Sequence, residues 1–260
     1  MLQADVEMMA MRAADPAVKQ AYAKLGEAIR YSDPMSHPTL VQVEESIKAL
    51  RMMADYGVDR VAATPHFYAA HSGESPEEFL ARRNAAEEIL REAMKNEKDL
   101  PEVFCGTEVK FFRGMSGVED LQKLTYQGTN LLLVEMPFSK WSEKEIKEVL
   151  SLNENLDVIP VLAHIERYFS YQKNLDWIYE FKDEGILMQM NAEYILGTFS
   201  SRKAMKLINN HAIDFLGSDT HNLTDRKPNL GPAIEKIEKK AHDEIMERFL
   251  RYEETYAPRG

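Results

Sequence analysis

Gly217-Ser218-Asp219-Thr220-His221-Asn222 follows the apolar run Ala212-Ile213-Asp214-Phe215-Leu216. A short apolar run before a turn predicts a buried strand, so this strand would deliver Asp219 and His221 just past its C-terminal end. A hard carboxylate and an imidazole on one turn make a good pair of metal ligands. The pair alone is a weak signal, and it gains weight only where the same pattern recurs along the chain.

The pattern does recur, because other strand-like runs also lead to acids or histidines. These runs lead to His66, Glu108, Glu135 and His164. In a barrel of parallel strands, the C-terminal ends gather on one rim, where active sites form. A carboxylate that ends an apolar strand is costly to bury unless it is paired or bound to a metal. The runs therefore predict an α/β barrel whose rim carries these residues together with Asp219 and His221.

Helical and strand patterns alternate from residue 41 onward, which is typical of βα units and a mainly parallel sheet. Ser75 before Pro76, and Ser142, are predicted helix caps. The predicted strands cover 58–63, 103–112, 131–135, 158–163, 186–190 and 212–217, and the predicted helices cover 41–56, 75–97, 142–152, 174–184, 201–210 and 232–252.

Residues 1–40 do not follow this alternation. Asp15 and Pro16 predict a helix that runs to Ile29, and a polar loop follows it up to Pro38. This segment is interpreted as an atypical helical N-terminal arm, and 41–260 as the barrel domain.

Composition and charge narrow the function classes. A chain of 260 residues suits one α/β barrel domain. The formal net charge of −11, without a basic cluster, argues against nucleic-acid partners. No apolar run approaches the ~18 residues of a membrane span, so no membrane insertion is expected. The single cysteine, Cys105, excludes an internal disulfide and fits the cytoplasm.

Cys105 is expected to be a buried apolar residue and not a nucleophile. A cysteine-dependent phosphatase needs an arginine about six positions after its cysteine. In this chain Phe111 stands at that distance from Cys105.

The ordered motifs resemble the polymerase-and-histidinol-phosphatase (PHP) domain, and most closely its bacterial protein-tyrosine phosphatase branch from capsule and exopolysaccharide clusters. The resemblance covers about three quarters of the chain. It rests on Ala63-Thr64-Pro65-His66, Gly106-Thr107-Glu108-Val109, Leu133-Val134-Glu135-Met136-Pro137-Phe138, Ala163-His164-Ile165-Glu166-Arg167-Tyr168 and Ser218-Asp219-Thr220-His221-Asn222, with Arg226 just beyond.

This resemblance implies a distorted (β/α)7-like barrel with a multinuclear site for divalent metals, most often manganese, with iron or zinc as alternatives. It implies removal of phosphate from tyrosines in the C-terminal tail of a tyrosine autokinase, and so control of capsule or exopolysaccharide synthesis. Closely spaced divalent metals suit this reaction, because they neutralise phosphoryl oxygens and lower the pKa of bound water.

The resemblance also implies roles for individual residues. Glu108 would bridge two metals, Glu135 and His164 would complete one of the sites, and Asp219 would bind the other. His66 and His221 would hold a third metal. Arg167 and Arg226 would bind phosphate oxygens, for which the planar fork of arginine is well shaped, although both could instead form salt bridges.

The chain departs from this family at its first motif, because it contains no Asp-x-His-x-His sequence. We hypothesise that His37 partly compensates by joining His66 and His221 in one subsite, while a third subsite is weakened or empty. The alternative for His37 is a surface-loop histidine.

A catalytically impaired barrel that binds a phosphorylated ligand or the kinase tail is the alternative function. Homo-oligomers are a further expectation that the sequence does not decide. Aromatic residues beside the rim positions could stack on a phosphotyrosine ring or simply pack in the core; they are Phe67, Tyr68, Phe138 and Trp141.

Overall fold

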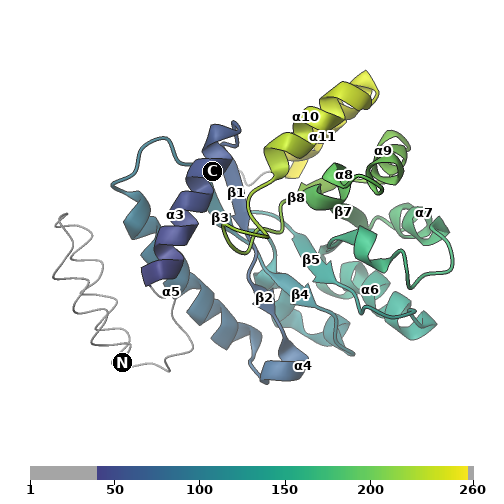
Figure 1. Ribbon diagram of the computed structural model, residues 1–260. Coiled ribbons are helices and arrows are strands. Elements are labelled where there is room, and N and C mark those ends of the chain that lie inside the picture. The colour runs from purple at the N-terminus through teal and green to yellow at the C-terminus, as the bar shows by residue number, and fades with distance from the viewer. Residues whose placement is uncertain (1–39, 257–260) are drawn as a thin grey trace.

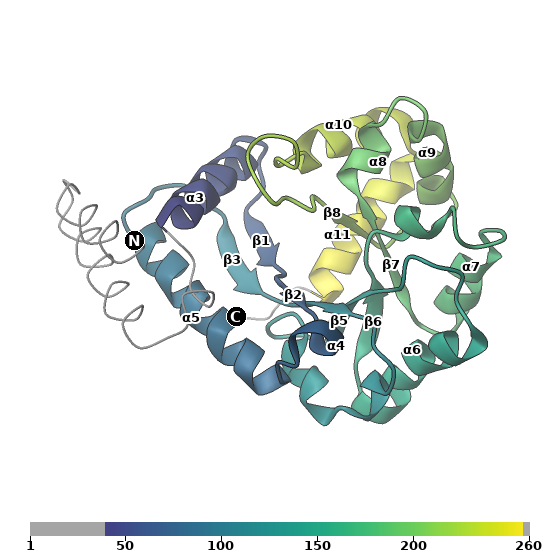
Figure 2. The ribbon, with the colours of Figure 1, turned by 60° about the horizontal axis from the view of Figure 1, so that its bottom comes forward.

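The strands of this protein form a curled parallel sheet with helices on its outer side (Figures 1 and 2). The computed structural model describes residues 40–256. Six strands lie in the order β2-β4-β5-β6-β7-β8, and β1 pairs with β3. Every pairing is parallel. The α/β class and the mainly parallel sheet predicted from the sequence are confirmed.

The strands alternate with helices along most of the chain. The first half contains α3 (Leu40–Asp55), β1 (Arg60–Ala63), β2 (His66–Phe67), α4 (Ala69–Ser72), α5 (Pro76–Met94), β3 (Glu102–Cys105), β4 (Glu108–Lys110), η1 (Met115–Gly117), η2 (Glu119–Leu124) and β5 (Leu131–Glu135). The second half contains α6 (Glu143–Leu156), β6 (Ile159–Leu162), η3 (Ile165–Tyr168), α7 (Asp176–Asp183), β7 (Leu187–Asn191), α8 (Ala192–Leu196), α9 (Ser201–Asn209), β8 (Phe215–Gly217), α10 (Leu230–Lys240) and α11 (Asp243–Tyr256).

Two predicted strands are divided in the structure. The predicted strand 103–112 is β3 and β4, separated at Gly106 and Thr107, and the run toward His66 is β1 and β2, separated at Thr64 and Pro65. Proline has no backbone N–H and cannot continue the ladder as a donor. After the breaks, β2 and β4 pair with each other in the six-stranded sheet, and His66 and Glu108 are partners in their register.

The predicted helix 232–252 is also two helices, α10 and α11. Ala241, between them, has extended backbone angles, and the His242 N–H donates to Asn209 Oδ1 at 3.1 Å. The backbone N–H of His242 therefore has its hydrogen-bond acceptor outside the helix, at the point where α10 ends. The predicted caps are confirmed: Ser75 and Ser142 each form a capping box at the start of α5 and α6.

The two faces of the sheet have different neighbours, because successive side chains of a strand point to opposite faces. Leu132 and Val134 of β5 belong to the large core under the outer helices. Leu131 and Leu133 belong to a small apolar cluster inside the curl. Glu135 shares their face, so the inner surface changes from apolar to charged at the carboxyl end of the strand.

The predicted N-terminal arm lies outside the described residues, apart from Leu40, which begins α3. Within the described part, β8 pairs with β7 alone, and no ladder joins β8 to β1. None of the helices within residues 40–256 has both the length and the apolar character needed to cross a membrane.

Candidate metal centre

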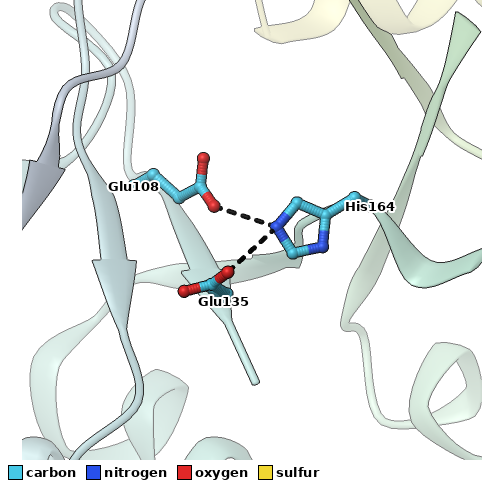
Figure 3. A group of neighbouring side chains, drawn as sticks. All are labelled: Glu108, Glu135 and His164. Carbon is cyan, nitrogen blue, oxygen red and sulfur yellow. Dashed lines mark hydrogen bonds and ion pairs between the residues drawn. The ribbon is translucent and has the colours of Figure 1, made fainter. Parts of the chain in front are cut away.

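Glu108, Glu135 and His164 converge inside the curl at the carboxyl end of the sheet (Figure 3). The Nε2 atom of His164 lies 3.0 Å from Glu108 Oε1 and 3.4 Å from Glu135 Oε1. All three residues are buried, and one ligand atom from each lies within 4.8 Å of the others. The sequence places these residues on separate strands, and the structure brings them to one point.

The strands determine how these side chains reach the same point. Glu108 begins β4 and Glu135 ends β5, both on the inner face. Ala163 lies on the inner face, so an extended His164 would point outward, but His164 has φ 35° and ψ 55°. This left-handed turn directs the imidazole inward. It costs a non-glycine residue of order 1–3 kcal/mol, a strain that clusters at functional sites.

A pair of histidines extends the cluster along the rim. His66 Nε2 lies 3.4 Å from His221 Nε2, and His66 Nδ1 lies 3.8 Å from Glu108 Oε1. His221 Nδ1 is 3.0 Å from the backbone oxygen of Asp219. The two histidines therefore connect the buried cluster to Asp219.

Asp219 is the meeting point of several donors. The guanidinium groups of Arg167 and Arg226 both pair with its Oδ2 atom. Asn191 Nδ2 donates to the same oxygen at 3.0 Å. Asp219 has φ 51°, so it is a second rim residue in the left-handed region. The structure thus places both predicted phosphate-binding arginines beside the predicted metal ligand Asp219, in ion pairs with it.

The electrostatics of the cluster follow from these contacts. Burial lowers the pKa of His164, but hydrogen bonds to Glu108 and Glu135 outweigh burial and raise that pKa to about 9. Burial alone would raise the pKa of Glu135, but His164 and Lys110 hold it below the usual value. For Asp219 the opposing effects are burial and the charges of Arg167 and Arg226, and the pKa is lowered. The carboxylates of Glu135 and Asp219 are therefore held in their charged, ligating form.

The residues present fit a divalent cation. His66 Nδ1 and Glu135 Oε2 are buried and make no hydrogen bond, although His66 Nδ1 lies 3.8 Å from Glu108 Oε1 and Glu135 Oε2 has an ion pair with Lys110 at 3.3 Å. Buried polar atoms are normally satisfied, and exceptions call for a reason such as an ion. Mixed imidazole and carboxylate donors suit manganese, iron or zinc.

Sequence reasoning missed three polar residues on the inner face. Lys110 is the register partner of Glu135. Gln189 accepts a hydrogen bond from the His164 N–H and donates to Asn191 Oδ1 at 2.8 Å, and Asn191 contacts Asp219. The alternation of side chains along a strand could have identified two of them. Gln189 and Asn191 alternate with the core residues Met188 and Met190, which places them on the opposite, inner face.

The four aromatic residues beside the rim positions differ in their burial. Phe67 and Trp141 are buried in the outer core, which confirms packing for these two. Phe138 is 39% exposed, and Tyr68 is half-buried. Cys105 is buried as predicted, and burial raises its pKa to about 12, which suppresses the thiolate. His37 lies outside the described residues.

The fold and this cluster define an α/β protein with a candidate metal centre at the carboxyl rim of a parallel sheet. The chain belongs to the family described as "Capsular polysaccharide synthesis, CpsB/CapC", which matches residues 40–256.

Its relatives include tyrosine-protein phosphatase YwqE of Bacillus subtilis (strain 168). This relative is 26% identical over 211 residues, which cover 77% of this chain and 79% of YwqE. Tyrosine-protein phosphatase CpsB of Streptococcus agalactiae serotype III (strain NEM316) is 28% identical over 206 residues, or 75% of this chain and 82% of CpsB.

The fold is also similar to a solved structure. The solved structure is one of those described for YwqE from Bacillus subtilis and CpsB from Streptococcus pneumoniae, which are called metal-dependent tyrosine phosphatases. The TM-score is 0.68 at 22% sequence identity, and the match covers 82% of this chain and 86% of the solved one. At this identity the likeness supports the shared fold.

Proposed function

We propose that this protein is a metal-dependent phosphomonoesterase that removes phosphate from protein tyrosine. The observation that carries the proposal is the cluster of Glu108, Glu135 and His164 on the same rim as Asp219 and two arginines. Relatives of similar length that are named tyrosine-protein phosphatases support the same conclusion.

The chain's own groups have separable roles in this proposal. Glu108, Glu135 and His164 hold one divalent cation, and His66, His221 and Asp219 are the donors for further ions. Manganese is the proposed metal, with iron or zinc as alternatives. A bound divalent cation supplies Lewis acidity for hydrolysis of a phosphate ester.

Arg167 and Arg226 bind the phosphate oxygens. Their guanidinium groups already converge on a carboxylate oxygen of Asp219, and a phosphate offers oxygens of similar geometry. Their side chains are partly exposed, whereas Glu108 and Glu135 are buried. The arginines would therefore meet the substrate at the solvent side of the buried cluster.

The proposed substrate is the phosphotyrosine-bearing C-terminal tail of a tyrosine autokinase, and the proposed role is control of capsule or exopolysaccharide synthesis. The family's description as one of capsular polysaccharide synthesis supports this role. A closed distorted (β/α)7-like barrel over 41–260, the helical arm, the cytoplasmic location and homo-oligomer formation remain predictions.

One observation favours a second candidate, a barrel that binds a phosphorylated ligand without turnover. The sequence lacks Asp-x-His-x-His, which the PHP resemblance leads us to expect at the first strand. Loss of those imidazoles would weaken one metal subsite and leave the arginines able to bind phosphate.

A phosphatase assay with a metal count separates the two candidates. We expect the full chain, reconstituted with manganese, to hydrolyse p-nitrophenyl phosphate and to lose this activity and bound metal in Asp219→Ala/His221→Ala. His242→Ala, which removes an exposed histidine outside the site, should retain both. Bound metal and phosphate without turnover of p-nitrophenyl phosphate or a phosphotyrosine peptide would favour the binding protein.

A further inference from the structure

Lys110 lies close to two aromatic rings at the edge of the candidate metal centre. Its Nζ atom is 5.5 Å from the centroid of the Tyr68 ring and 5.6 Å from that of the Phe138 ring. The same atom is 3.3 Å from Glu135 Oε2. Tyr68, between β2 and α4, and Phe138, after β5, thus both lie near the Lys110 ammonium. That ammonium also contacts Glu135 of the candidate metal centre.

Each ring also packs on one of the candidate ligands. The Tyr68 ring is stacked on His66, with centroids 5.1 Å apart and an interplanar angle of 18°. The Phe138 ring is stacked on His164, at 5.8 Å and 28°. Each ring is therefore packed against one of the imidazoles that would hold metal, and both rings lie near Lys110.

The exposure of Phe138 is not explained by packing alone. The other aromatic residues next to rim positions, Phe67 and Trp141, are buried in the outer core. Phe138 keeps 39% of its surface exposed while it also touches Tyr168. An aromatic face left open beside a polar catalytic cluster is suited to contact the apolar part of a ligand whose charged part binds the cluster.

We propose that Tyr68 and Phe138 form an aryl subsite that makes the protein select phosphate esters of aromatic alcohols over those of aliphatic alcohols. This inference rests on the proposed phosphatase function and identifies the residues that would give its tyrosine specificity. Aromatic faces are electron-rich and attract the electropositive edge of another ring, as they attract the Lys110 ammonium. Lysine has a flexible stem, so a substrate ring can take the place of its ammonium beside the two rings.

Binding of two phosphonates tests the subsite without turnover. Phenylphosphonate and methylphosphonate carry the same charged group and differ in the ring. We expect calorimetry on manganese-loaded protein to give tighter binding of phenylphosphonate. Phe138→Leu should weaken phenylphosphonate by about 3- to 10-fold, the range for loss of one aromatic pair, and leave methylphosphonate unchanged.

Matched variants separate a ring contact from a general disturbance of the site. Phe138→Tyr keeps the ring and should keep the preference for phenylphosphonate, whereas Tyr68→Leu should reduce it. Phe199→Leu removes the same ring at a 97% exposed position between α8 and α9, and it should bind both phosphonates like the wild type. Metal content is measured for each variant and should equal that of the wild type.

The outcomes distinguish this inference from the proposed function. A wild type that prefers phenylphosphonate through Phe138 but hydrolyses no phosphotyrosine peptide supports the subsite and contradicts the phosphatase. An active wild type whose preference survives both Phe138→Leu and Tyr68→Leu overturns the subsite and leaves the phosphatase standing. Binding of neither phosphonate, or equal weakening of both by Phe138→Leu, also overturns the subsite.

Discussion

His66 Nε2 lies 3.4 Å from His221 Nε2, although 155 residues separate the two in the sequence. His66 begins β2 and His221 follows β8, and these are the two edge strands of the six-stranded sheet. Side chains from opposite edges can touch only because the sheet curls until its edges approach at the rim. The contact therefore brings the first and last strands of the six-stranded sheet into one site.

The proposal that His66 and His221 hold the same metal ion predicts that the losses from mutating them are non-additive. His66→Ala and His221→Ala should each lower kcat/KM by at least the 10- to 100-fold that disturbance of a metal's surroundings typically costs. The double variant should be scarcely worse than either single variant, because residues that act as a unit are non-additive. Kinetics with p-nitrophenyl phosphate and metal counts measure this. Losses that multiply would place the histidines in separate roles.

Metal-stripped protein should lose stability in mildly alkaline solution. The pKa of His164 is raised from 6.5 to about 9 in the folded state by Glu108 and Glu135. The proton on His164 therefore stabilises the fold fully below about pH 6.5, and this contribution disappears as the pH rises through about 9. Urea unfolding in the presence of a chelator, between pH 6 and pH 10, measures the slope.

His164→Gln is the control for this pH dependence, because it removes the titrating imidazole. The metal-stripped variant should show a flatter dependence of its free energy of unfolding over the same range. An unchanged slope in the variant would assign the titration to another group.

Gly217 has no side chain, and this leaves space for the side chains of Gln189 and Asn191 on the inner face. An alanine Cβ at this position would lie 1.8 Å from Gln189 Nε2 and 3.1 Å from Asn191 Oδ1. Gln189 would have to move, and its contacts with His164 and Asn191 would be lost. We expect Gly217→Ala to lower kcat/KM by about 10- to 100-fold, as small misplacements of catalytic groups do.

Gly117→Ala is the matched control for this steric effect. A Cβ at Gly117 meets no atom within 4 Å, and this glycine does not have a positive φ. Activity of Gly117→Ala should be close to that of the wild type. Equal activity of both alanine variants would contradict a role for Gln189 in positioning the site.

Lys182 of α7 forms an ion pair with Asp214, the buried residue just before β8. Lys182 Nζ lies 2.6 Å from Asp214 Oδ2, which also accepts the Met188 N–H at 2.9 Å. Asp214 is almost fully buried, so Lys182→Met would leave its charge uncompensated. We expect a loss of about 3–5 kcal/mol in the free energy of unfolding, measured by urea denaturation.

An exposed ion pair provides the comparison for Lys182. Lys239 pairs with Glu235 across one helical turn of α10, and both side chains are mostly exposed. Lys239→Met should change the free energy of unfolding by no more than about 1 kcal/mol, because surface pairs contribute little. A similar small change for Lys182→Met would mean that Asp214 is stabilised without its partner.

The strands and helices were predictable where local signals were strong. The strand 131–135 coincides with β5, and the caps Ser75 and Ser142 are where the sequence placed them. The predicted boundaries were wrong at two places with different causes. Pro65 interrupts the strand that leads to His66, and a tertiary contact of His242 with Asn209 accompanies the break after α10.

The candidate site was predictable as a set of residue types but not as a geometry. His66, Glu108, Glu135, His164, Asp219 and His221 were identified because acids and histidines end apolar runs. Lys110, Gln189 and Asn191 were missed, although their alternation with core residues marks them as inner-face positions. A polar residue inside a strand has many uses, and only its neighbours in space identify the one that applies.

The sequence by itself determined that strands alternate with helices in a parallel α/β fold, and that acids and histidines collect at the strand ends, because hydrophobic period and local caps act over a few residues. Only the tertiary structure decided which of these residues meet. The curl of the sheet brings His66 to His221, and the left-handed backbone of His164 turns its imidazole toward Glu108 and Glu135. Both depend on packing between distant segments, which no local pattern encodes.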